Sequence, residues 1–225
     1  MVELRDCDAM VFDCDGVLVD SETIANEVLR EVIGELGWAM SQDQAHRTFV
    51  GHALPDTVKI VTEHFAAQGD RPDASWVETY RARRDAELAA RLSPMHGVAG
   101  MLAAALRRFK GRVGVASNSP RGKLDMQLRR TALDEVFHAA HVFSGMDMPQ
   151  PKPAPDVYRA AAASFDPPSR RFAVLEDSPS GVKAGVAAGG YVIGLSTVFS
   201  GADLRAAGAH RVVASLPDAA ELLRP

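Results

Sequence analysis

The fold of this chain is decided by the stretch 9-AMVFDCDGV-17, in which an apolar run leads directly into two aspartates separated by a cysteine. An uninterrupted apolar run of this length is typical of a strand that is buried on both faces of a parallel sheet. In open sheets of this kind, the loops at the carboxyl ends of the strands line the ligand crevice. We therefore expect Asp13 and Asp15 to face one pocket.

A short apolar run, polar residues and a helical stretch recur in the same order through the second half of the chain. Further strands are predicted at 113–116, 140–143, 172–175, 191–195 and 211–214. Helices are predicted between them at 98–109, 120–130, 155–165 and 180–188, with Ser119 as the N-cap of the second. This alternation predicts an α/β fold with a doubly wound parallel sheet.

Residues 21–93 break the alternation, because their apolar residues recur only with helical spacing. Ile24, Val28 and Val32 show this spacing, and Trp76 and Tyr80 show it again before the chain returns through a Ser-Pro pair. The sequence therefore predicts a helical cap domain, 21–93, inserted into an α/β core made of 1–20 and 94–225.

Composition excludes several classes of protein. The net charge of −4 argues against a general binder of the phosphate backbone, so we expect no nucleic acid partner. No apolar run approaches the roughly 20 residues needed to span a membrane, and the charged first ten residues do not resemble a signal peptide. We therefore expect a cytoplasmic protein. Cys7 and Cys14 suit neither a disulfide framework nor a metal knuckle, and we expect free thiols.

Polar residues also follow other predicted strands, and they are expected at the same edge as Asp13 and Asp15. They are Ser117, Asn118 and Ser119 after the second strand, Lys152 before a later helix, and Glu176 and Asp177 after the fourth strand. Four carboxylates that close would repel one another unless a cation joined them. Oxygen ligands without histidine or cysteine favour Mg²⁺ over zinc.

Each motif alone has a structural alternative. Asp15-Gly16 is common turn chemistry, the serines before Pro120 suit a helix N-cap, Lys152 suits a solvated loop, and Glu176-Asp177 suits an acidic helix start. A calcium loop is disfavoured, because Val17 and Ile24 stand where oxygen ligands would be needed. Only the joint pattern favours a catalytic site.

Together these motifs resemble the haloacid dehalogenase superfamily of phosphohydrolases. The stretch 13–21 is similar to the first motif of that family, Ser117-Asn118 to the second, Lys152 to the third, and 176–181 to the fourth. The order and spacing match over nearly the whole chain. A helical insertion after the first motif is similar to the small cap of the branch that contains sugar-phosphate phosphatases and β-phosphoglucomutase.

The resemblance implies a role for each matched residue. Asp13 would attack phosphorus and form an aspartyl phosphate, and Asp15 would act as general acid and base. Mg²⁺ would be held by Asp13, the backbone carbonyl of Asp15 and Asp177, with support from Glu176. Lys152 would balance charge. Ser117 and the backbone near Asn118 would hold the phosphoryl oxygens of the substrate.

Departures from the family pattern narrow the reaction. The mutase branch carries a histidine where this chain has Ala25, and it carries a cap-loop arginine that the loop 51–55 lacks. We therefore expect a phosphatase of a small phosphorylated metabolite, a sugar or sugar acid, with the 117–152 region similar to 6-phosphogluconate phosphatases. A phosphosugar mutase and a non-catalytic binding protein remain alternatives.

The cap is expected to choose the substrate, with His52 as its best polar candidate for substrate binding. A surface loop histidine is the alternative at that position. Nothing in the sequence indicates an obligate protein partner, and we expect a monomer or weak dimer.

Overall fold

The computed structural model describes residues 3–50, 52 and 54–224 of the chain. The chain forms two compact units, one made of Met1–Asp20 with Ser93–Pro225 and one made of Ser21–Leu92. Where the chain leaves and returns to the first unit, the backbone N–H of Asp20 donates to the Ser93 carbonyl at 3.0 Å, and that of Met95 donates to the Leu18 carbonyl at 2.9 Å. No helix in the described ranges is long and apolar enough to cross a membrane.

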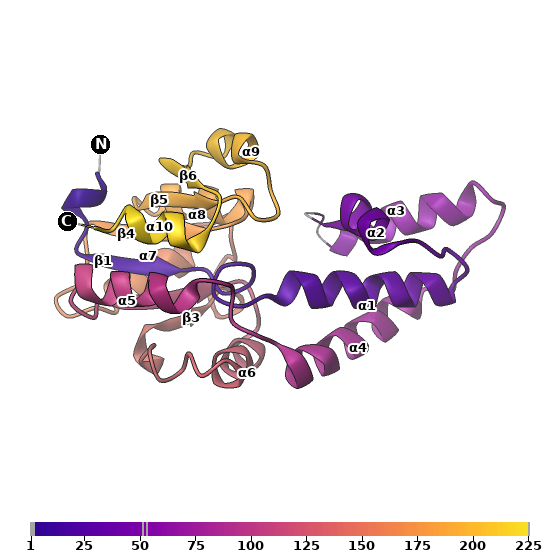
Figure 1. Cartoon of the computed structure of the whole chain (residues 1–225), viewed down its shortest axis with the longest axis horizontal. Helices are drawn as coiled ribbons and strands as arrows, with labels where there is room; N and C mark the ends of the chain where they lie inside the picture. The colour runs from indigo at the N-terminus through magenta and orange to yellow at the C-terminus, as the bar shows by residue number, and fades with distance from the viewer. Residues whose placement is uncertain (1–2, 51, 53, 225) are drawn as a thin grey trace. The chain divides into compact units, whose positions relative to one another are not determined.

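The first unit is built on a parallel sheet with the strand order β3-β2-β1-β4-β5-β6 (Figure 1). Its strands are β1 (Ala9–Phe12), β2 (Val113–Ser117), β3 (Val142–Ser144), β4 (Phe172–Glu176), β5 (Tyr191–Leu195) and β6 (Arg211–Val213). Its α-helices are α5 (Val98–Arg108), α6 (Arg121–Arg130), α7 (Asp156–Ala163), α8 (Pro179–Ala187), α9 (Gly201–Ala206) and α10 (Leu216–Glu221). The doubly wound α/β prediction is therefore confirmed.

The central strands are buried on both faces, as their continuous apolar runs require. Every residue of β1 is fully buried. Ala9 and Val11 belong to a cluster that includes Val157 of α7 and Val182 of α8, and the alternation of a strand directs the residues between them to the opposite face. There, the rings of Phe12 and Phe137 form a T-shaped pair with their centroids 5.9 Å apart.

The register of the strands brings their carboxyl ends to one level. Phe12 of β1 pairs with Val115 of β2 and with Leu175 of β4, so Asp13 follows β1 beside the ends of both neighbours. Helix α8 starts directly after β4, since the Ser178 hydroxyl accepts from the Gly181 N–H at 3.1 Å and Pro179 occupies the first turn. The sheet therefore presents its polar motifs along a single edge.

Two predictions about local structure were wrong in detail, and two short helices were not predicted. The strand predicted at 140–143 is β3, which starts at Val142 after a 3₁₀ turn over Ala139–His141. Ser119 does not cap α6, because Pro120 is the N-cap residue and the Ser119 hydroxyl donates to Asp15. The short helices α9 and α10 were not predicted. Both follow serine N-caps whose hydroxyls accept from the backbone three residues later.

The second unit consists of α1 (Ser21–Glu35), α2 (Gln42–Phe49), α3 (Leu54–Ala66) and α4 (Trp76–Arg91). Helix α1 packs on α4, and Arg91 of α4 forms an ion pair with Glu27 of α1 at 2.7 Å. Helix α2 was not predicted, although Ser41 and Gln44 form a capping box at its start.

Candidate active site

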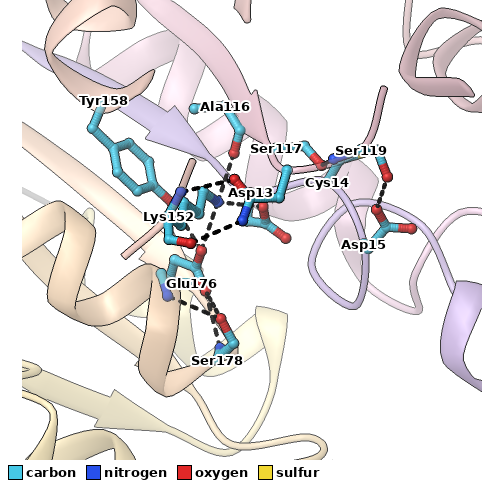
Figure 2. A network of polar contacts seen from close by, with 12 residues as sticks. Asp13, Cys14, Asp15, Ala116, Ser117, Ser119, Lys152, Tyr158, Glu176 and Ser178 are labelled. Carbon is cyan, nitrogen blue, oxygen red and sulfur yellow. Dashed lines mark hydrogen bonds and ion pairs between the residues drawn. The ribbon is translucent and has the colours of Figure 1, made fainter. Parts of the chain in front are cut away.

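A buried lysine joins the ends of three strands in the first unit. The Lys152 Nζ donates to the Asp13 carboxylate at 2.5 Å, to the Glu176 Oε1 at 2.7 Å and to the Ala116 carbonyl at 2.8 Å. Its side chain lies over the ring of Tyr158 from α7, at 4.7 Å from the ring centroid. Figure 2 shows these groups converging on one point. A loop lysine exposed to solvent is thereby excluded.

Burial and neighbouring charges shift the pKa values of Asp13 and Lys152. Burial raises the pKa of the Asp13 carboxyl to about 7, with Glu176 and Asp15 adding to the rise and Lys152 opposing it. Burial alone would lower the pKa of Lys152, but the carboxylates of Asp13 and Glu176 hold it well above its ordinary value. The site therefore keeps a cation among several acidic groups.

Glu176 is held on both of its oxygens by the protein. Its Oε1 accepts from Lys152 and from the Tyr158 hydroxyl at 3.0 Å, and its Oε2 accepts from the backbone N–H and the hydroxyl of Ser178 at 2.9 and 3.0 Å. Gly181 lies so close to this carboxylate that a Cβ there would overlap it. Glu176 is thus fixed in one orientation.

Asp13, Glu176 and Asp177 can each offer one oxygen to a common cation. These atoms all lie within 4.8 Å of one another, and all three residues are buried. Gly16 has a φ of +74° and a Cβ at that position would overlap the Asp177 carboxylate. Hard oxygen donors without nitrogen or sulfur fit Mg²⁺. Among the described residues, Asp13, Glu176 and Asp177 therefore form the acidic cluster that could hold an ion. The Asp15 carboxylate does not belong to this cluster.

The Asp15 carboxylate points away from Asp13, toward the start of α6 (Figure 2). Its Oδ2 accepts from the Ser119 hydroxyl at 2.7 Å, and its Oδ1 accepts from the Gln127 Nε2 at 2.7 Å. The Lys123 Nζ lies 3.5 Å from the same Oδ1. Hence three of the four expected carboxylates converge, whereas the fourth lies beside polar side chains from the 119–127 segment.

Ser117 is the last residue of β2, Asn118 follows it, and both side chains contact the backbone. The Ser117 hydroxyl accepts from the Ser119 N–H at 3.0 Å. The Asn118 amide group accepts from the Lys152 N–H at 2.9 Å and donates to the Lys152 carbonyl at 3.2 Å. The Asn118 side chain therefore fixes the loop that carries the lysine.

His52 belongs to the second unit. Its side chain is exposed, and its backbone N–H donates to the Phe49 carbonyl at 3.1 Å. Gly51 and Ala53, which flank it in the loop singled out from the sequence, lie outside the described residues. Its proposed role in binding substrate stays a prediction.

Three polar residues of the site were not predicted from the sequence: Lys123, Gln127 and Tyr158. The contact between Ser119 and Asp15 was not predicted either. Gln127 carried a signal, because it lies on the buried face of α6 with Leu124 and Leu128. A polar side chain on an apolar face usually has a partner. The thiols behave as predicted: both are free, and burial together with Asp15 and Asp13 raises the pKa of Cys14 well above its ordinary value.

Known proteins are similar to this chain over most of its length. The family model for haloacid dehalogenase-like hydrolases matches residues 7–189. The chain is 27% identical to 6-phosphogluconate phosphatase of Escherichia coli over 81% of its own length and 79% of that protein. It is 31% identical to a plasmid-encoded phosphoglycolate phosphatase of Cupriavidus necator, covering 97% and 94%. It is 27% identical to β-phosphoglucomutase of Bacillus subtilis, covering 87% of each.

Two solved structures of haloacid dehalogenase-like proteins are also similar to this chain. A haloacid dehalogenase-like protein of unknown function from Agrobacterium tumefaciens matches with a TM-score of 0.81 and 29% identity, covering 96% of this chain and 97% of the other. A hydrolase of the same family from Deinococcus radiodurans, solved with bound phosphate and sodium, matches with a TM-score of 0.78 and 30% identity, covering 97% and 98%.

Proposed function

The chain belongs to the haloacid dehalogenase-like hydrolases, and from that premise we propose that it is a Mg²⁺-dependent phosphatase of a small sugar or sugar-acid phosphate. The observation that carries the proposal is the contact of the Lys152 ammonium with the Asp13 carboxylate, beside two further buried carboxylates. A phosphate ester is an anion, and a carboxylate nucleophile can reach it only where positive charge offsets their repulsion.

Asp13 would act as the nucleophile in two balanced steps. In the first, a carboxylate oxygen of Asp13 bonds to phosphorus, the ester P–O bond breaks, and the leaving oxygen takes a proton from Asp15. In the second, water gives its proton to the Asp15 carboxylate and bonds to phosphorus, and the bond to Asp13 breaks. Inorganic phosphate leaves, and both carboxyl groups return to their starting states.

The remaining residues would stabilise charge and orient the phosphoryl group. Lys152 would balance the negative charge that develops on the transferred oxygens, while Ser117 and the backbone near Asn118 would bind those oxygens. Asp13, Asp177 and the backbone carbonyl of Asp15 would hold the Mg²⁺, with Glu176 in support. When bound, this ion would neutralise part of the charge of the phosphate.

We assign the second unit the role of a cap that selects the substrate, with His52 as its candidate contact. A cytoplasmic location and a monomer or weak dimer also stay predictions.

The test is phosphate release from sugar, sugar-acid and polyol phosphates, including 6-phosphogluconate, with Mg²⁺ or with EDTA. The matched control is Asp13→Asn, which removes the nucleophile and changes little in volume. We expect release that needs both Mg²⁺ and Asp13. Equal release by wild type and Asp13→Asn would overturn the proposal, as would a folded wild type that is inert toward the whole panel.

Similarity to β-phosphoglucomutase supports a second candidate, a phosphosugar mutase. Ala25, on α1, provides no acid–base group at the position where that branch has a histidine, which favours hydrolysis. Conversion of a hexose 1-phosphate to its 6-phosphate without release of phosphate would favour the mutase instead.

Binding of Mg²⁺ should stabilise the protein more at pH 8 than at pH 6. The pKa of Asp13 is raised to about 7, so protons compete with the ion at pH 6. Because the pKa of Asp13 is higher in the folded than in the unfolded protein, this group stabilises the folded apo protein fully at a pH below the pKa of the unfolded state. This stabilisation is lost as pH rises through about 7. With Mg²⁺ at 100 times its Kd, we expect the Tm to rise by about 5–10 °C at pH 8.

Thermal unfolding with and without Mg²⁺ at pH 6, 7 and 8 checks this prediction. Asp177→Asn is the control, and it should abolish most of the shift at every pH. A shift of the same size at all three pH values would contradict the role given to Asp13.

A further inference from the structure

Gln127 is a fully buried amide that needs an explanation beyond packing. It lies on α6 at 0% exposure, on the same face as Leu124 and Leu128. Burying an amide costs free energy unless its donor and acceptor find partners. Both ends of this amide turn to the loop after β1: Nε2 donates to Asp15 Oδ1 at 2.7 Å, and Oε1 accepts from the Cys14 thiol at 3.7 Å.

Lys123 approaches the same oxygen from one helical turn earlier. Residues four apart lie on the same face of a helix, so Lys123 and Gln127 can contact one carboxylate together. The Lys123 Nζ lies 3.5 Å from Asp15 Oδ1, and Ser119 donates to the other oxygen. We call Ser119, Lys123 and Gln127 the Asp15 donor set.

The Lys152 ammonium competes with this donor set for the Asp15 carboxylate. The ammonium of Lys152 attracts carboxylates, and it already contacts Asp13 and Glu176. An Asp15 side chain without other partners would be drawn toward that ammonium and would crowd the nucleophile. In the structure the Asp15 carboxylate instead lies near the surface, with a side-chain exposure of 25% against 10% for Asp13.

We infer that Gln127, assisted by Lys123, is a positioning residue that holds the Asp15 carboxyl apart from the nucleophile and ready to exchange a proton with the leaving group. The inference rests on the proposed phosphatase function, in which Asp15 is the general acid. The chemistry of phosphoryl transfer does not itself require an amide on α6. The role given to Gln127 is inferred from its contacts with Asp15 and Cys14.

The experiment compares two substrates that differ in their need for an acid. The alkoxide that leaves an alkyl ester such as 6-phosphogluconate needs a proton, whereas the p-nitrophenolate that leaves p-nitrophenyl phosphate is stable without one. The parameter to measure is kcat/KM, because it covers only the steps through departure of the leaving group. Gln127→Met keeps the length of the side chain and removes the donor.

We expect Gln127→Met to lower kcat/KM for the alkyl ester by about 10- to 100-fold, and for p-nitrophenyl phosphate by less than about 3-fold. Asp15→Asn should show the same selectivity, and adding Gln127→Met to it should cause no further loss. Equal losses on both substrates, or losses that add in the double variant, would overturn the inference, because either result indicates a general structural defect.

Lys123 keeps the inference testable if Gln127→Met does not fold, because its side chain is partly exposed. Lys123→Met should lower the alkyl-ester rate selectively, by about 3- to 10-fold, and Lys123→Arg should restore it. Arg129→Met, at an exposed position of the same helix, should change neither rate. An unselective effect of Lys123→Met would count against the inference, and a wild type inert toward both substrates would remove the proposed function on which it rests.

Discussion

Replacing Lys152 with methionine is expected to lower kcat/KM by at least about 1,000-fold and the free energy of unfolding by about 3–5 kcal/mol. The lysine is 7% exposed, and its ammonium is the shared partner of Asp13, Glu176 and the Ala116 carbonyl. Methionine fills similar space but leaves two buried carboxyl groups without their cation. Breaking a buried ion pair from one side is costly, because the remaining charge is not compensated.

A second substitution separates folding from chemistry. Lys152→Met combined with Glu176→Gln removes one of the uncompensated charges, so part of the lost stability should return while activity stays absent. Urea unfolding and phosphate release measure the two effects. The control is Lys183→Met on α8, an exposed lysine whose loss should change neither quantity by much. If Lys152→Met were as stable and active as Lys183→Met, the contacts of Lys152 with Asp13 and Glu176 would have no role in stability or in activity.

The sequence allowed the sheet and the edge of the site to be predicted, because both depend on local patterns. Apolar runs such as 9–12 and 172–175 identify strands buried in a parallel sheet, and the residue after each run must lie at the carboxyl edge. Helix and strand ends were less accurate. The strand at β3 is short, and its first predicted residues form a 3₁₀ turn instead.

The partners of Asp15 could not be predicted, because they depend on tertiary contact. Ser119 has two available uses: its hydroxyl can cap a helix or donate to a nearby carboxylate. In the structure the hydroxyl donates to Asp15 at 2.7 Å, and Pro120 is left as the N-cap residue of α6. In the same way, the sequence did not predict that the Asn118 side chain pairs with the backbone of Lys152 across a separation of 34 residues. A local pattern does not specify a pairing at that distance.

Gly16 explains how the first motif and the fourth can approach so closely. Its φ of +74° is a left-handed conformation that favours glycine, and its missing side chain leaves the space in which the Asp177 carboxylate lies. Gly16, in the turn after β1, therefore lets Asp177, which follows β4, reach the same point as Asp13.

Gly16→Ala is therefore expected to weaken Mg²⁺ binding by at least about 100-fold, since it displaces a proposed ligand directly and loss of a supporting contact alone costs about 10- to 100-fold. The matched control is Gly69→Ala. Gly69 has nearly the same φ, +76°, but a Cβ there meets nothing within 4 Å. Both variants carry the strain of alanine in a left-handed conformation, about 1–3 kcal/mol, so the difference between them isolates the collision with Asp177.

Calorimetric titration with Mg²⁺ measures the Kd of both variants, and the rise in Tm on adding Mg²⁺ gives an independent value. Gly69→Ala should bind Mg²⁺ like the wild type despite its lower stability. Because the collision weakens binding rather than removing the nucleophile, phosphatase activity of Gly16→Ala should recover in part when Mg²⁺ is raised well above the wild-type Kd. Equal Kd values for the two alanine variants would show that Asp177 does not hold the ion. In that case, raising Mg²⁺ should not restore the phosphatase activity of Gly16→Ala.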